Sequence, residues 1–169
     1  MEIDKSTRHA KLIGDCGEAV ICNWLSRSGF EVVLVDHTGI DIVAYHVKSR
    51  RRLGLTVKSR TRLARTEKGP VYVFRQSKND RQKVTDACRA FGCEPWLAVY
   101  VETAQGADVY VTSLEHYDAT YRRPGKVIDA WKMGDRARQT YCLDPEVRHL
   151  SVSFAGKHWN WSSLVHREA

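Results

Sequence analysis

Residues 39–58 read GIDIVAYHVKSRRRLGLTVK. Two segments of this stretch, 40–45 and 53–58, are rich in apolar and β-branched residues, and the polar residues 48–52 separate them. Such a pattern is typical of two β-strands joined by a turn. Because side chains alternate along a strand, Thr56 and Lys58 share one face of the second strand and its apolar residues share the other. The stretch also places an acid, Asp41, at the start of the first strand.

The residues before this stretch predict a helix and one more strand. Apolar residues recur at three-and-four spacing from residue 7 to residue 28, and Ser28-Gly29 supplies a stop signal. Residues 30–35 are rich in β-branched valine, and the turn composition of residues 36–39 follows them. We therefore expect an amphipathic helix followed by a hairpin of strands 30–35 and 40–45.

The residues after the stretch predict a helix between strands. Residues 71–74 form a short apolar segment, a helical pattern runs from about 80 to 91, and residues 96–101 form a continuous apolar run. A strand, a helix and a strand in this order indicate a parallel crossover, and the apolar run is typical of a strand buried on both sides. Residues 107–114 alternate as an edge strand would, and the periodicity fades beyond Glu115.

Composition restricts the class of protein. The chain of 169 residues is 43% apolar, so it is neither disordered nor fibrous, and its length fits one domain. No apolar run approaches the length of a membrane span and the N-terminus has no signal-peptide core, so we expect a cytoplasmic protein without membrane contact. The five cysteines never form a C-x-x-C pair, and we interpret them as reduced packing residues. The histidines show no ligand spacing, and none is assigned to a metal.

The net charge of +7 is concentrated in one segment. Residues 41–68 contain nine basic and two acidic side chains, whereas the rest of the chain is close to neutral. A basic segment of this kind favours a polyanionic partner such as nucleic acid. The candidate contacts with the phosphate backbone are basic residues on both sides of the 53–58 strand and two glutamines near the second helix, namely Lys48, Arg50, Arg51, Arg52, Arg60, Arg62, Arg65, Gln76 and Gln82.

Three short motifs together resemble the PD-(D/E)XK nuclease superfamily. They are Gly17-Glu18 on the first helix, Gly39-Ile40-Asp41 after the turn, and Thr56-Val57-Lys58 on the third strand. Residues 91–99, FGCEPWLAV, further resemble a helix end and strand of archaeal-type Holliday junction resolvases. The resemblance covers about residues 7–102. It implies an α/β fold of the restriction-endonuclease-like type, αβββαβ, with a central mixed sheet flanked by helices. The core would span residues 1–115, and residues 116–169 would be a C-terminal extension packed on it.

The chemistry of phosphodiester hydrolysis fits these residues. A hard cation, Mg²⁺ or Mn²⁺, must be held by converging carboxylates, and Asp41 is the best candidate ligand. Lys58 is suited to orient the attacking water or to offset charge on the phosphate. The resemblance implies that Glu18 and the backbone carbonyl of Val57 are further ligands, and that Thr56 occupies a catalytic position. It also implies a metal-dependent DNA endonuclease, with DNA favoured over RNA, and a two-fold dimer if the substrate is branched DNA.

Thr56 departs from the family pattern, which has an acid or sometimes glutamine at this position. A hydroxyl is a poorer ligand than a carboxylate for a hard cation, and Asp15 or Asp36 are the candidates to replace the missing acid. Two alternatives therefore stay open. One is a nuclease-like protein that binds nucleic acid without cutting it, and the other is an interaction protein whose basic segment contacts an acidic partner.

Overall fold

A computed structural model describes residues 8–35, 37–62 and 68–154. Two sequence predictions, Asp36 as a replacement acid and Arg65 as a phosphate contact, lie outside these residues. The described elements, in chain order, are α1 His9–Arg27, β1 Phe30–Leu34, β2 Ile42–His46, β3 Arg52–Thr61, β4 Val71–Arg75, the 3₁₀ helix η2 Gln76–Lys78, α2 Asp80–Phe91, β5 Glu94–Glu102, β6 Gly106–Ser113, α3 Leu114–Thr120, β7 Ile128–Trp131, α4 Asp135–Leu143 and β8 Arg148–Ser153.

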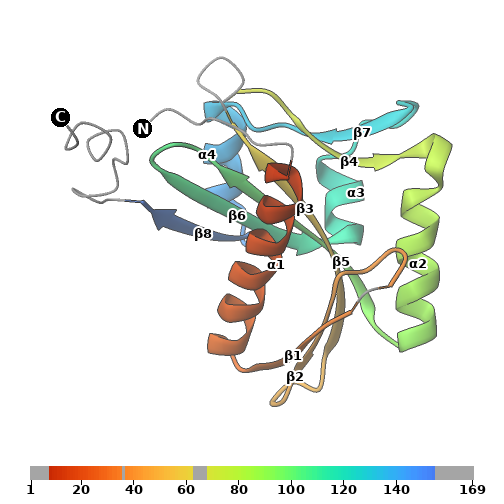
Figure 1. The fold of residues 1–169 in the computed structure, drawn as a ribbon. Helices are drawn as coiled ribbons and strands as arrows, with labels where there is room; N and C mark the ends of the chain where they lie inside the picture. The colour runs from red at the N-terminus through yellow and green to blue at the C-terminus, as the bar shows by residue number, and fades with distance from the viewer. Residues whose placement is uncertain (1–7, 36, 63–67, 155–169) are drawn as a thin grey trace.

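Six of the strands form one mixed sheet, in the order β1-β2-β3-β5-β6-β8 (Figure 1). The β3–β5 pair is parallel and the other neighbours are antiparallel. The predicted hairpin of the first two strands is confirmed, with Val33 opposite Val43. The predicted α/β class, a central mixed sheet flanked by helices, is confirmed as well.

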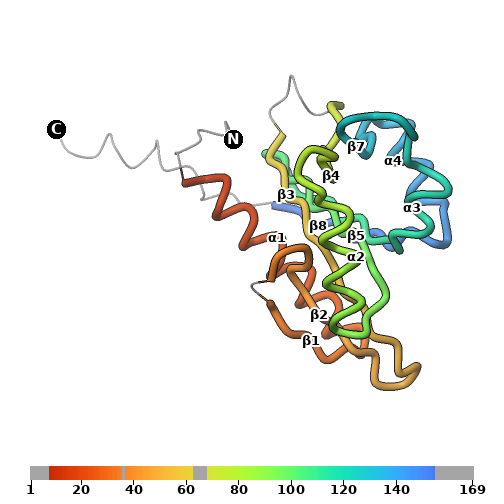
Figure 2. Tube along the Cα trace, turned by 90° about the vertical axis from the view of Figure 1, so that its right-hand side faces the viewer, coloured from red at the N-terminus to blue at the C-terminus, as the bar shows by residue number. Residues whose placement is uncertain are grey.

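The alternation of side chains in β3 separates two hydrophobic cores, one on each face of the sheet. Leu55 and Val57 pack with Ile21 and Leu25 of α1, whereas Val84 of α2 belongs to the core on the opposite face. The two helices accordingly lie on opposite sides of the central strands (Figure 2). Odd-numbered residues of β3 such as Leu55 therefore face α1, and the even-numbered residues face α2, because successive side chains in a strand point to opposite faces.

A glycine brings α1 close to the sheet. A Cβ atom on Gly17 would overlap Ser59 Oγ and come within 3.0 Å of Tyr100 Cβ. The absence of a side chain at this position lets the helix backbone lie directly over β3 and β5. The neighbouring residue, Glu18, is thereby held beside β3.

Two expectations about the strands are wrong. The segment expected to be the first strand of the parallel crossover, β4, pairs with β7 in a separate two-stranded sheet, and β3 is the parallel neighbour of β5. The segment expected to be an edge strand, β6, lies inside the main sheet because β8 pairs with its outer side. Both partners, β7 and β8, come from the region where the periodicity of the sequence fades, so the pairings could not be read from the first 115 residues.

None of the helices in the described parts of the chain combines the length and the apolar composition that crossing a membrane requires.

Candidate active site

The connection between β1 and β2 is pressed against α2, and this contact positions Asp41. Gly39 has a φ of 114°, a conformation that favours glycine, and a Cβ atom on it would overlap the backbone carbonyl of Lys83 in α2. The backbone of Asp41 is then tied on both sides. Its N–H donates to the carbonyl of Leu55 at 2.8 Å, and its own carbonyl accepts from the N–H of Val35 at 2.9 Å.

The side chain of Asp41 extends the hydrogen bonding of β3 beyond the end of β2. Its Oδ2 accepts the backbone N–H of Val57 at 2.6 Å, one step along β3 from the Asp41–Leu55 bond. In a strand, the N–H and C=O of one residue point to the same side. The carbonyl of Val57 is therefore on the side of β3 where the Asp41 carboxylate lies.

Glu18 faces the same region from α1, where it is half-buried. Burial is the main cause that raises the pKa of its carboxyl group, and the negative charges of Asp41 and Asp15 raise it further. The positive charge of Lys58 acts in the opposite direction. Glu18 on α1 is therefore within electrostatic range of Asp41, before β2, and of Lys58, on β3.

Thr56 and Lys58 lie on the same face of β3, opposite to α1. They pair with Leu97 and Val99 of β5, which belong to the core on the α2 side. This face was expected to be outward, but Thr56 is only 2% exposed because α2 and β4 cover it. The Lys58 ammonium donates to the Thr56 hydroxyl at 3.1 Å. The Thr56 hydroxyl therefore helps to fix the position of the Lys58 ammonium.

The donor atoms in this region suit a hard cation in kind. The carboxylates of Glu18 and Asp41 and the carbonyl of Val57 are all oxygen donors, as Mg²⁺ and Mn²⁺ prefer. Burial first and the charge of Asp41 second raise the pKa of Glu18, and a cation bound by both carboxylates would relieve their repulsion. Within the described ranges, however, no set of three or more acidic, histidine or cysteine side chains is arranged to hold a metal. Water or substrate oxygens would have to complete the coordination.

The predicted phosphate contacts in the β2–β3 turn lie away from this site. Lys48 and Arg50 are exposed, but Arg51 forms a salt bridge with Glu94 and lies 5.6 Å from the centre of the Trp96 ring. Arg52 donates to the carbonyl of Phe91 at 3.2 Å, at the end of α2. Arg52 and Lys58 are six positions apart along β3, which corresponds to about 20 Å.

The remaining predicted phosphate contacts, at the other end of β3 and near α2, differ in exposure. Arg60 is exposed, whereas Arg62 is only 7% exposed, and burial lowers the pKa of its guanidinium group. Gln76 is exposed in η2. Gln82 is exposed on α2, where it donates to Asp86 at 2.9 Å. Among these residues, Arg60 is the exposed cation nearest in sequence to Lys58.

The fold matches a solved nuclease. The structure resembles that of Hjc, a Holliday junction resolvase from the archaeal hyperthermophile Archaeoglobus fulgidus, with a TM-score of 0.51 and 18% sequence identity over 75% of this chain and 88% of that chain. No protein-family model and no curated protein sequence matches the chain. At this level of identity the likeness concerns the fold alone, and the protein has a mixed α/β fold like that of a Holliday junction resolvase.

Proposed function

We propose that the protein is a Mg²⁺-dependent DNA endonuclease that acts on branched DNA. The observation that supports the proposal is that the Asp41 carboxylate binds the Val57 N–H just before β2 begins, and that the charges of Asp41 and Lys58 both act on Glu18. Two carboxylates, a backbone carbonyl and a lysine in this region would supply the chemistry of phosphodiester hydrolysis. The likeness to the fold of a Holliday junction resolvase supports branched DNA as the substrate.

Each residue has a distinct part in the proposed reaction. Asp41, Glu18 and the Val57 carbonyl would hold the cation, which when bound polarises the phosphate and stabilises the leaving oxygen. Lys58 orients the attacking water or offsets negative charge on the phosphate. Thr56 positions Lys58 through the 3.1 Å hydrogen bond between them. Arg60 contacts the DNA backbone near the scissile phosphate.

A two-fold dimer follows from the substrate. Cutting a junction symmetrically requires two strands to be cleaved, and a dimer with a two-fold axis supplies one active site for each strand. Sedimentation at micromolar concentration tests this part of the proposal, and a monomer that still cleaves both strands would contradict it.

The decisive experiment combines cleavage with metal dependence. We expect a labelled four-way DNA junction to be cut in Mg²⁺ or Mn²⁺ and to remain intact in EDTA. Asp41→Asn should abolish cutting while keeping the acceptor for the Val57 N–H, and Glu115→Gln, a change at an exposed acid of α3, is the matched control. Intact junction, linear duplex and nicked duplex in both metals would refute the endonuclease.

A second function is favoured by one observation. One oxygen of Asp41 already accepts the Val57 N–H, and the acid that would complete a third ligand is replaced by Thr56. A protein that binds DNA without cutting it needs no metal. It would retain DNA in a salt-sensitive manner in EDTA, and Asp41→Asn would leave the retention unchanged. If neither DNA nor RNA is retained at low salt, the basic segment serves an acidic protein partner instead.

A further inference from the structure

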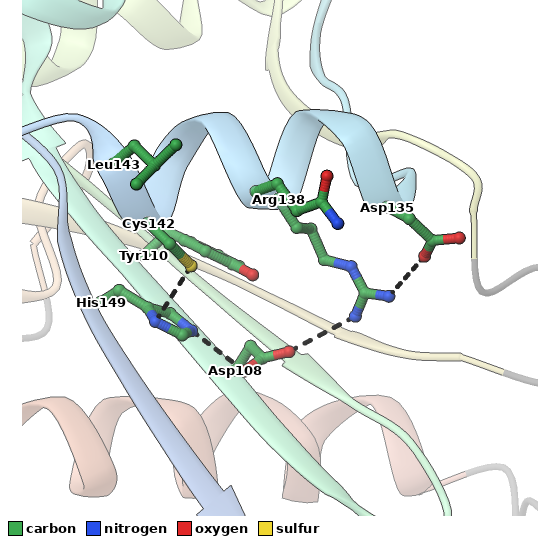
Figure 3. Close-up of a pocket in the computed structure, with 8 residues that line it drawn as sticks. Asp108, Tyr110, Asp135, Arg138, Cys142, Leu143 and His149 are labelled. Atoms are coloured by element: carbon green, nitrogen blue, oxygen red, sulfur yellow. Dashed lines mark hydrogen bonds and ion pairs between the residues drawn. The ribbon is translucent and has the colours of Figure 1, made fainter.

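A pocket of about 650 Å³ lies at the end of the sheet far from β2. Figure 3 shows the side chains that line it. It is bordered by the helix α4 and by the neighbouring strands β6 and β8. β5 and β6 lie between β3 and β8 in the sheet, so the pocket is separate from the candidate active site. Its lining includes Asp108, Tyr110, Arg138, Cys142 and His149.

Three of these residues form a chain of hydrogen bonds. The Sγ atom of Cys142 is 3.4 Å from Nδ1 of His149, and Nε2 of the same ring is 3.1 Å from Oδ1 of Asp108. An ionised carboxylate only accepts hydrogen bonds, so Nε2 carries the ring proton of the neutral imidazole. The lone pair of Nδ1 is then directed at the thiol of Cys142. The histidine is thus in the tautomer that accepts a proton from sulfur.

The imidazole ring is held in this orientation from several sides. The ring of Tyr110 stacks on it with centroids 4.8 Å apart and an angle of 16° between the planes. Asp108 accepts from Ser151 Oγ at 2.5 Å and lies 3.4 Å from Nη1 of Arg138. Arg138 also binds Asp135. Asp108 and the ring therefore have fixed partners, and the free end of the chain is the exposed thiol of Cys142.

We propose that Cys142 is a nucleophile that takes an acyl group from a small ester or thioester entering this pocket, with His149 as its base and Asp108 as the positioning residue. The proton of Sγ passes to Nδ1 of His149, and the sulfur forms a bond with the acyl carbon. The bond from that carbon to the leaving oxygen or sulfur breaks. The leaving group departs with the proton from His149, and Cys142 remains as a thioester.

The first test needs only the unmodified protein. Cys16 is an internal control because its thiol is also exposed, while its polar contact is the Tyr100 hydroxyl at 3.9 Å and not an imidazole. We expect limiting iodoacetamide at neutral pH to alkylate Cys142 at least about tenfold faster than Cys16, as measured by mass spectrometry of peptides. Equal rates at the two cysteines would overturn the proposal.

The second test probes the acyl step with 4-nitrophenyl acetate. We expect a burst of nitrophenol with one acetyl group on Cys142, and no burst from Cys142→Ala. His149→Ala should slow acetylation about tenfold or more, and Asp108→Asn should weaken the dependence of the rate on pH. Cys16→Ala, which removes the other exposed thiol and leaves the pocket unchanged, should retain the burst. An acetyl group on Cys142 that forms as fast in His149→Ala as in the unmodified protein would refute the role of His149.

Discussion

The carboxylate of Asp41 accepts the backbone N–H of Val57 at 2.6 Å. Asp41 directly precedes β2, and its side chain continues the hydrogen bonding between β2 and β3 beyond the first residue of β2. It also places the carboxylate beside the Val57 carbonyl, within the electrostatic reach of Glu18. One residue thus completes the strand pairing and supplies a candidate metal ligand.

The double role of Asp41 separates two substitutions. Asp41→Ala removes the acceptor and leaves the Val57 N–H without its partner, so we expect the free energy of unfolding to fall by about 1.5–3 kcal/mol. Asp41→Asn keeps a carbonyl acceptor and should lose less than half of that amount. Both should lose DNA cleavage. Urea denaturation measures the difference, and equal stability of the two variants would show that the hydrogen bond is unimportant to folding.

Gly39 should resist substitution because of its contact with α2. Gly39→Ala places a methyl group at a φ of 114° against the Lys83 carbonyl, and we expect a loss of about 2–3 kcal/mol in stability. Gly125→Ala is the matched control, because Gly125 has a φ of 78° with nothing within 4 Å of the added atom. It should lose only about 1 kcal/mol. Thermal denaturation compares the two, and similar losses would contradict the close approach to α2.

The raised pKa of Glu18 predicts a pH-dependent stability. The folded protein holds the Glu18 proton more tightly than the unfolded chain, so the free energy of unfolding decreases as the pH rises from the ordinary pKa of 4.5 towards the raised folded value. Glu18→Gln removes this loss. The variant should match the original protein at about pH 4 and be more stable than it at about pH 7. Urea denaturation at the two pH values measures this difference. A Glu18→Gln variant that is less stable than the original protein at neutral pH would contradict the raised pKa of Glu18.

Many of the helices and strands could be predicted because local sequence patterns determine them. The helix over residues 9–27, the hairpin and the helix over residues 80–91 all occur where periodicity and turn residues placed them. The positions of Asp41 and Lys58 follow from the same patterns, since a turn fixes the first and strand parity fixes the second. The side-chain bond from Asp41 to Val57 could not be predicted, because it depends on the place where β2 ends relative to β3.

Long-range pairing explains the failures. β6 alternates like an edge strand, yet β8 covers it from a segment without clear periodicity. The sequence predicts packing roles for the cysteines, which holds for the buried Cys88 but not for the exposed Cys16 and Cys142. The partners of Cys142 come from β6 and β8, so no local spacing in the sequence indicated their meeting.

The two ends of β3 should contribute unequally to DNA binding. Arg60 is exposed near the candidate site. Arg51 lies next to the far end of β3, more than about 20 Å from Lys58, and is already paired with Glu94. We expect Arg60→Glu to weaken junction binding by about tenfold or more and to reduce its salt dependence, and Arg51→Glu to have a smaller effect. Fluorescence anisotropy at several salt concentrations measures both. A larger effect at Arg51 would place the DNA on the β2–β3 turn instead.

Substitution of Thr56 tests whether the side chain at this position can reach a bound cation. Thr56→Glu introduces the missing acid at a buried position beside Lys58, so without metal we expect the free energy of unfolding to fall by about 1–3 kcal/mol. Thr56→Gln has nearly the same size without the charge and should lose a similar amount. Mn²⁺ should then restore stability and increase cleavage in Thr56→Glu but not in Thr56→Gln, because only a carboxylate adds a charged ligand. Calorimetric titration with Mn²⁺ and the junction assay measure both effects. If Mn²⁺ affects the two variants alike, the side chain at position 56 does not reach the cation.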